Sequence, residues 1–109
     1  MIDVRFDEID GVLVVVPQFT RLDCVNAITF RELILDRVSG KDRVVLALGH
    51  VRYMDSSGIS CFVQVIKRMG AGGQLRLAEV DDRVYSLLKL TRLDRIFPAF
   101  ADVAGAIRG

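Results

Sequence analysis

Four consecutive residues near the middle of the chain, Asp55-Ser56-Ser57-Gly58, carry side chains suited to chemistry. They follow an apolar run and precede a helical pattern, so they stand where a helix presents backbone N–H groups without internal partners. Carboxylate and hydroxyl oxygens accept hydrogen bonds from such groups, and helix capping alone would explain the segment. A serine hydroxyl can also act as a nucleophile, which makes hydrolysis the first reaction to test.

A serine hydrolase would need more than these hydroxyls. Its nucleophile lies in a G-x-S-x-G turn and works with a histidine base. Ser57 has Asp55 rather than glycine two residues before it, and His50 is the single histidine of the chain. A lone histidine after an apolar run is typical of a loop residue, so we assign it no role. The sequence therefore predicts that the protein is not an enzyme.

The other candidate motifs favour structural roles. The glycine cluster at residues 70–73 precedes a strand pattern, whereas nucleotide-binding loops join a strand to a following helix. Cys24 and Cys61 lack C-x-x-C spacing and have no basic cluster around them in sequence. The sequence contains neither a Walker loop nor a run of metal ligands. We expect free thiols, no metal and no cofactor.

Composition narrows the class of partner. Fifteen basic and fourteen acidic residues leave a net charge of +1, which provides no strong field for nucleic acid or an anionic membrane. The apolar stretch at 12–16 is far shorter than the ~20 residues of a membrane-spanning helix, and the N-terminus does not resemble a secretion signal. We expect one cytoplasmic domain over residues 1–109 that recognises a protein or a small ligand.

The first half of the chain reads as strands separated by a helix. Residues 2–7 alternate apolar and charged, and Asp10-Gly11 is a hairpin turn signal, so the first two strands should pair antiparallel. The runs at 12–16 and 44–48 are apolar without alternation, which is typical of central strands covered on both faces. Between them, 23–38 predicts a crossover helix whose apolar positions are Val25, Ile28, Leu35 and Val38.

The second helix is predicted to begin at the Asp55 motif and to cover residues 57–69. A stripe at helical spacing should face the sheet, and it consists of Ile59, Phe62, Val63 and Ile66. The opposite side then carries Cys61, Val65 and Arg68. These three read as scattered surface residues, with a partner-contacting face as the alternative.

The last third predicts smaller elements: a strand at 75–80, short helices at 81–89 and 99–107, and a brief strand at 95–97. Strands and helices alternate along the whole chain. The sequence therefore predicts an α/β fold, with a mixed, mostly parallel sheet flanked by crossover helices.

Three segments together resemble the STAS family of bacterial anti-sigma factor antagonists. They are the region 44–80 around the D-S-S-G motif, the pair Leu22-Asp23, and the closing LLKLTRLDRIF, so the resemblance covers essentially the whole chain. It implies a single-domain STAS-like fold and phosphorylation of Ser56, the serine directly after the aspartate. The partner-binding residues that it implies are Asp23, Asp55, Ser56, Ser57 and Gly58.

The resemblance also implies a switching mechanism. The unmodified antagonist binds an anti-sigma factor that is a serine protein kinase and thereby frees the sigma factor. Phosphorylation releases the antagonist, and a serine phosphatase resets it. ATP and magnesium then belong to the kinase, and the chain itself is expected to be a monomer or weak dimer. The alternative is a STAS subunit of a larger assembly, such as a stress-signalling or lipid-transport complex.

Two positions depart from the family pattern. Family members usually carry Asp or Asn where Ala47 stands, which leaves the expected fold unchanged. They also carry a glycine and an acidic residue before the leucine-aspartate pair, where this chain has Phe19-Thr20-Arg21. This second difference makes the partner surface harder to transfer from the family.

Three physical expectations concern the site. A phosphate of about −1.5 to −2 charges at a helix N-terminus suits the helix dipole, so it should act on an interface rather than unfold the domain. Asp23 should lie at the same sheet edge as Ser56, because loops after parallel strands gather at the strands' carboxyl ends. Gly58 should permit a close approach of backbone as the helix begins.

Overall fold

The chain begins with a β-hairpin, as the sequence predicts. β1 (Val4–Ile9) and β2 (Val12–Pro17) pair antiparallel. Asp10 and Gly11 between them have φ of 52° and 77°, the left-handed backbone that a two-residue hairpin turn of type I′ requires. The structure is a computed structural model and describes residues 2–109.

Three further strands complete a mixed sheet in the order β1-β2-β4-β6-β7. β4 (Arg43–Ala47), β6 (Gln74–Ala78) and β7 (Ala99–Phe100) all run parallel to β2. Only β1 is antiparallel to its neighbour. The predicted α/β fold with a mostly parallel sheet is confirmed.

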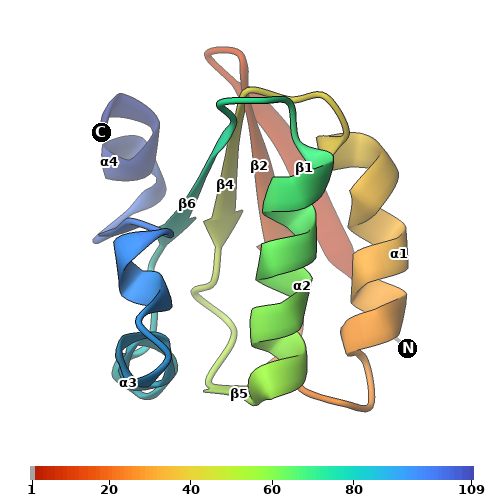
Figure 1. Cartoon of the computed structure of the whole chain (residues 1–109), viewed down its shortest axis with the longest axis vertical. Helices are drawn as coiled ribbons and strands as arrows, with labels where there is room; N and C mark the ends of the chain where they lie inside the picture. The colour runs from red at the N-terminus through yellow and green to blue at the C-terminus, as the bar shows by residue number, and fades with distance from the viewer. Residues whose placement is uncertain (1) are drawn as a thin grey trace.

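Helices cover both faces of this sheet, which explains why the central strands lack alternation. α1 (Ala27–Val38) and α2 (Ser56–Arg68) lie side by side on one face, with α3 (Asp82–Leu90) beyond α2 (Figure 1). Leu13 and Val15 of β2 join the large core on that side. Val12, Val14 and Val16 join a smaller core with α4 (Val103–Arg108) on the other face. β2 is therefore buried along its whole length.

The first helix differs from its prediction at the N-terminus. Residues 24–26 form a turn and α1 begins at Ala27, four residues later than expected from the sequence. The residues buried by α1 are Ala27, Phe30, Ile34 and Val38. Val25 and Ile28, predicted as core positions, are 86% and 61% exposed. The helix is turned so that small Ala27 faces α2 and the larger Ile28 faces outward.

The prediction that Cys61 and Val65 lie on the surface of α2 was wrong. They are 3% and 0% exposed, whereas Val63 and Ile66 of the predicted stripe are half-buried. The reason is that α2 packs against α1 as well as the sheet, and the Cys61 thiol donates a hydrogen bond to the Ala27 carbonyl at 3.2 Å. A helix with two packing partners needs a wider apolar arc than one stripe. Arg68 is exposed, as predicted.

The C-terminal elements are also placed differently from the prediction. Leu93–Arg95 forms a short 3-10 helix rather than a strand, and the last strand is β7 at Ala99–Phe100. The final helix, α4, starts at Val103 with Asp102 as its cap. Two-residue strands and one-turn helices carry too few residues for a periodic pattern to define them.

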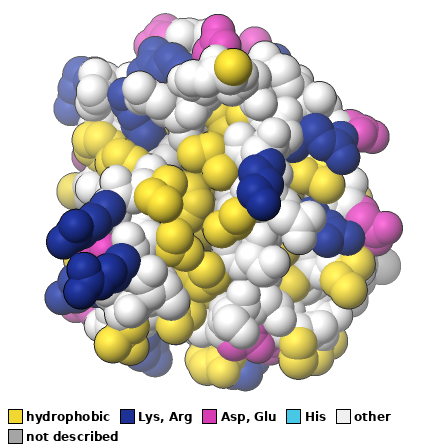
Figure 2. Space-filling model, viewed as in Figure 1, with side chains coloured by type: hydrophobic (Ala, Val, Ile, Leu, Met, Phe, Trp, Pro, Cys, Tyr) yellow, Lys and Arg dark blue, Asp and Glu magenta, His cyan; other side chains and the backbone are white. Residues whose placement is uncertain are grey.

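The face of the molecule that carries α1 and α2 shows a band of hydrophobic side chains flanked by Lys and Arg side chains (Figure 2). The large hydrophobic residues with the greatest exposure anywhere on the described chain are Val25, Leu90, Ile28, Ile96, Leu33, Tyr53 and Ile9. Val25, Ile28 and Tyr53 flank the D-S-S-G motif in the fold. Apolar surface is therefore available beside the predicted partner site.

Candidate functional site

Two strands that the sequence did not predict form the base of the site. β3 (Arg21–Leu22) and β5 (Tyr53–Met54) pair in parallel as a separate two-stranded sheet, with Arg21 opposite Tyr53. The Arg21 guanidinium stacks 4.1 Å from the centre of the Tyr53 ring. Each strand leads directly into one of the two predicted motifs.

The pairing of β3 and β5 brings Asp23 and Asp55 to the same edge. The backbone N–H of Cys24, next to Asp23, donates a hydrogen bond to Asp55 Oδ2 at 3.2 Å. The prediction that Asp23 lies at the same edge as the D-S-S-G motif is confirmed. This contact ties the loop before α1 to the start of α2 across 31 residues of sequence.

Asp55 is the N-cap of α2. Its Oδ1 accepts a hydrogen bond from the Ser57 backbone N–H at 2.8 Å, while Oδ2 holds the Cys24 N–H. Both oxygens of the carboxylate are thus used by backbone donors. The capping role that the sequence allowed is confirmed, and one aspartate fixes both loops of the site.

Asp23 organises its own loop. Its Oδ1 accepts from the Val25 N–H at 3.0 Å, and its Oδ2 lies 3.2 Å from Arg21 Nε. The Asn26 side chain bridges the same turn, accepting from the Asp23 N–H and donating to the Arg21 carbonyl. This turn explains why α1 starts later than the sequence predicted.

Ser56 is the first residue of α2 and is exposed, while Ser57 is partly buried. Within residues 2–109 neither serine hydroxyl has a hydrogen-bond partner, and Ser57 contributes its backbone N–H to the cap. The Ser56 hydroxyl is therefore free for a reaction with an external enzyme. Its neighbour is constrained by the cap.

Gly58 is buried on the inner side of the helix start. A Cβ built on it would lie 2.5 Å from Met54 Cγ and 3.1 Å from Leu22 Cγ. The close approach predicted for Gly58 is present, but it is made to β3 and β5 rather than to the outer surface. Gly58 was predicted as a partner-binding residue, but it is buried against β3 and β5 and does not form part of the outer surface.

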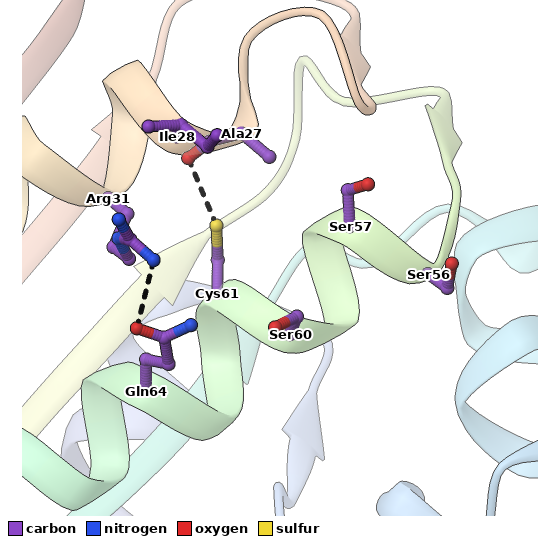
Figure 3. A pocket seen from close by; sticks show the side chains of 8 residues that line it. All are labelled: Ala27, Ile28, Arg31, Ser56, Ser57, Ser60, Cys61 and Gln64. Atoms are coloured by element: carbon purple, nitrogen blue, oxygen red, sulfur yellow. Dashed lines mark hydrogen bonds between the residues drawn. The ribbon is translucent and has the colours of Figure 1, made fainter.

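A hollow of about 310 Å³ opens between α1 and α2 beside these serines. Its lining residues are Ala27, Ile28, Arg31, Ser56, Ser57, Ser60, Cys61 and Gln64. Ser57 and Ser60 lie along the α2 side, and Ser56 stands at the outer end, away from Arg31 and Gln64 (Figure 3). From the sequence, Ile28 was predicted only as a core position of the first helix. Arg31, Ser60 and Gln64 were not singled out, because nothing in the spacing of the sequence relates α1 to α2.

A hydrogen bond connects the two helices at the end of the hollow that lies away from Ser56 (Figure 3). Arg31 Nη1 donates to Gln64 Oε1 at 3.1 Å, joining α1 to α2. Burial raises the pKa of the Cys61 thiol, and the nearby Arg31 charge opposes this shift. Cys61 is thus a neutral, free thiol packed between α1 and α2.

Residues 2–109 contain no group of three or more His, Cys, Asp and Glu side chains placed to hold a metal ion. None of the helices in that part of the chain has the length and hydrophobicity needed to cross a membrane. The glycine cluster at 70–73 forms a turn, closed by a hydrogen bond from the Gly73 N–H to the Gly70 carbonyl at 2.8 Å.

The sequence is similar to proteins named as anti-sigma factor antagonists. A protein of Thermotoga maritima, provisionally named an anti-sigma factor antagonist, is 28% identical over 102 residues, which are 91% of this chain and 89% of the relative. The crystal structure of a T. maritima protein with the same provisional name matches 96% of this chain and 92% of its own, with a TM-score of 0.84 at 25% identity.

More distant structures share the fold. A STAS domain protein from Planctomyces limnophilus, described as an anti-sigma factor antagonist, has a TM-score of 0.91 at 24% identity and covers 99% of this chain and 97% of its own. The Bacillus antagonist SpoIIAA matches at 0.79 in its unphosphorylated form, with 15% identity over 97% of this chain and 95% of its own. Its phosphorylated form matches at 0.67, with 14% identity over 97% and 98%.

The decisive match is to a family rather than to a single relative. The STAS domain model aligns with residues 3–106, from the first strand to the last helix. That span includes the β3–β5 pair, the capped start of α2 and the hollow beside it. The chain belongs to the STAS domain family.

Proposed function

We propose that this chain is an anti-sigma factor antagonist that is controlled by phosphorylation of Ser56. Unmodified, it binds an anti-sigma factor that is a serine kinase, and the sigma factor is released. The kinase transfers phosphate from its own ATP to Ser56, the modified antagonist dissociates, and a serine phosphatase restores it. Relatives named anti-sigma factor antagonists support the general function.

One observation carries the choice of Ser56: it is exposed at the first residue of α2, whereas Ser57 is partly buried. A kinase must reach the hydroxyl and draw the segment toward its active site. Ser57 is less accessible, and its N–H is held by Asp55. The exposed serine is therefore the better acceptor of the two.

The fold has reasons to tolerate the phosphate. The N-terminus of α2 presents backbone N–H groups and the positive end of a thirteen-residue helix. The neighbouring Asp55 carboxylate is compensated by two backbone donors. SpoIIAA, which shares the fold, has been solved in both unphosphorylated and phosphorylated forms. We expect the modified domain to remain folded.

The effect of the phosphate then falls on the interface. A hydrated dianion has to be desolvated or placed beside partner groups that cannot match its charge. A 100-fold loss of affinity corresponds to about 2.7 kcal/mol, which one repelled or unpaired charge in an interface is able to cost.

The test compares Ser56→Ala, Ser56→Glu and the matched control Ser57→Ala. The partner is the anti-sigma factor kinase of the source organism, identified with the immobilised chain and then purified. We expect Ser56→Ala to bind constitutively, Ser56→Glu to bind about 100-fold more weakly, and Ser57→Ala to be phosphorylated and released normally. Calorimetry measures affinity, and mass spectrometry after incubation with kinase and ATP locates the phosphate.

Phosphate found on Ser57 alone would contradict the proposal. So would equal affinities of the Ser56→Ala and Ser56→Glu variants. Circular dichroism of each variant controls for folding, since the proposal requires that all three variants keep the native fold.

A further inference from the structure

The hollow between α1 and α2 contains one ionised side chain, Arg31, and its other lining residues are neutral. Arg31 takes part in none of the ion pairs formed among residues 2–109. Its Nε is buried without a hydrogen-bond partner, and the Gln64 contact occupies only one of the five N–H donors of the guanidinium. Arg31 therefore retains both charge and hydrogen-bonding capacity.

None of the residues that line the hollow carries a negative charge. The N-terminus of α2 adds positive potential at the same hollow through its helix dipole. The nearby carboxylate, Asp55, has both oxygens hydrogen-bonded to backbone N–H groups. The hollow thus favours an anion that can accept hydrogen bonds from a guanidinium.

The rim of the hollow indicates what carries that anion. Ile28 lines it and is 61% exposed, and Val25, 86% exposed, lies in the turn leading into α1. A free inorganic anion gains nothing from an apolar rim. A protein surface that presents an acidic side chain among apolar residues matches both features, and such apolar contacts around an arginine are typical of interface centres.

We propose that the anti-sigma factor inserts an Asp or Glu side chain into this hollow, where its carboxylate pairs with Arg31 while Ile28 packs against the surrounding apolar surface. This inference rests on the proposed function and specifies how its partner is recognised. It also relates phosphorylation to binding, because Ser56 stands at the outer end of the same hollow (Figure 3). A phosphate there places negative charge at the entrance of the hollow and repels the incoming carboxylate.

The first test removes the charge of Arg31. Arg31→Gln should weaken binding of the purified anti-sigma factor by about 30-fold or more, the loss typical of removing one partner of a buried charge pair. Arg68→Gln is the matched control: it removes an exposed arginine near the other end of α2 and should change affinity by less than about threefold. Arg31→Glu should be rescued by replacing one acidic residue of the partner with Lys.

A second test does not disturb the interior. Ile28 is exposed, so Ile28→Asp and Ile28→Lys should both fold, and circular dichroism checks this. Both lose the apolar contact, but only Ile28→Asp places a negative charge beside the incoming carboxylate. We expect Ile28→Asp to bind at least about tenfold more weakly than Ile28→Lys in low salt, with the difference shrinking as salt is added.

Equal affinities of Arg31→Gln and Arg68→Gln, or of the two Ile28 variants, would overturn the proposal. If the unmodified chain still binds and Ser56 phosphorylation still releases it, only this inference fails and the proposed function stands. If the unmodified chain binds no anti-sigma factor, the proposed function fails, and the inference falls with it.

Discussion

The N-termini of α2 and α3 use the same local chemistry. In each, an aspartate precedes the helix and accepts a hydrogen bond from the backbone N–H two residues later. Asp55 holds the Ser57 N–H at 2.8 Å, and Asp81 holds the Arg83 N–H at 2.9 Å. The two caps are interchangeable as far as the helices themselves are concerned.

The other contacts of the two capping aspartates differ. Asp55 uses its other oxygen to bind the Cys24 N–H from a distant loop, and the next residue is the exposed Ser56. Asp81 interacts with the guanidinium groups of Arg83 and Arg52, at 3.1 and 3.8 Å. Its next residue, Asp82, has no hydroxyl. A capping aspartate therefore marks a helix start, and the tertiary contacts decide which start becomes a site.

The largest expected effect comes from disturbing the packing at the start of α2. Gly58→Val should destabilise the domain by about 2 to 3 kcal/mol, because the new side chain overpacks against Met54 and Leu22. Urea denaturation measures the loss of stability. Gly70→Ala is the control, since its Cβ meets nothing closer than 3.5 Å, and a similar cost for both variants would contradict the packing explanation.

Removing the cap of α2 should have a smaller effect on stability but a specific effect on the site. Asp55→Ala loses the Ser57 contact and costs about 1 kcal/mol of unfolding free energy. It also frees the Cys24 loop, so amide hydrogen exchange at Cys24 and Val25 should accelerate. Asp81→Ala should leave exchange at these two residues unchanged. If both variants protect the loop equally, the link between Asp55 and Cys24 is unimportant in solution.

The smallest expected effect is a pH dependence at α3. The hydrogen bonds from Arg83 hold the pKa of Asp81 below its usual value, and the charge of Arg52 contributes in the same direction. A carboxyl group with a lowered folded pKa stabilises the protein above the unfolded value of about 3.9, and this contribution is lost as pH falls through the folded pKa. Carbon-detected NMR titration should show Asp81 deprotonated to lower pH in the native protein than in an Arg83→Gln variant. Coinciding titration curves would contradict the pairing.

Features that depend on neighbouring residues were predicted correctly from the sequence. The hairpin at Asp10-Gly11, the central strands and the cap at Asp55 each follow from a local rule that involves neighbouring residues. The wide buried face of α2 was missed, because whether Cys61 is exposed depends on α1, which lies far away in sequence. The two-residue strands β3 and β5 were missed, because pairing rather than propensity defines them.

The sequence by itself determined that this is an α/β fold and that a helix starts at Asp55, next to two serines. Those features depend on hydrophobic period and capping chemistry, which act over a few residues. Only the tertiary structure decided that Asp23 and Asp55 share an edge, that Gly58 faces inward, and that Arg31 lies in the same hollow as the serines. It also decided that Arg31 forms no ion pair among residues 2–109. These relations join α1 and α2 across some thirty residues. A rule based on neighbouring residues cannot relate positions that far apart in sequence.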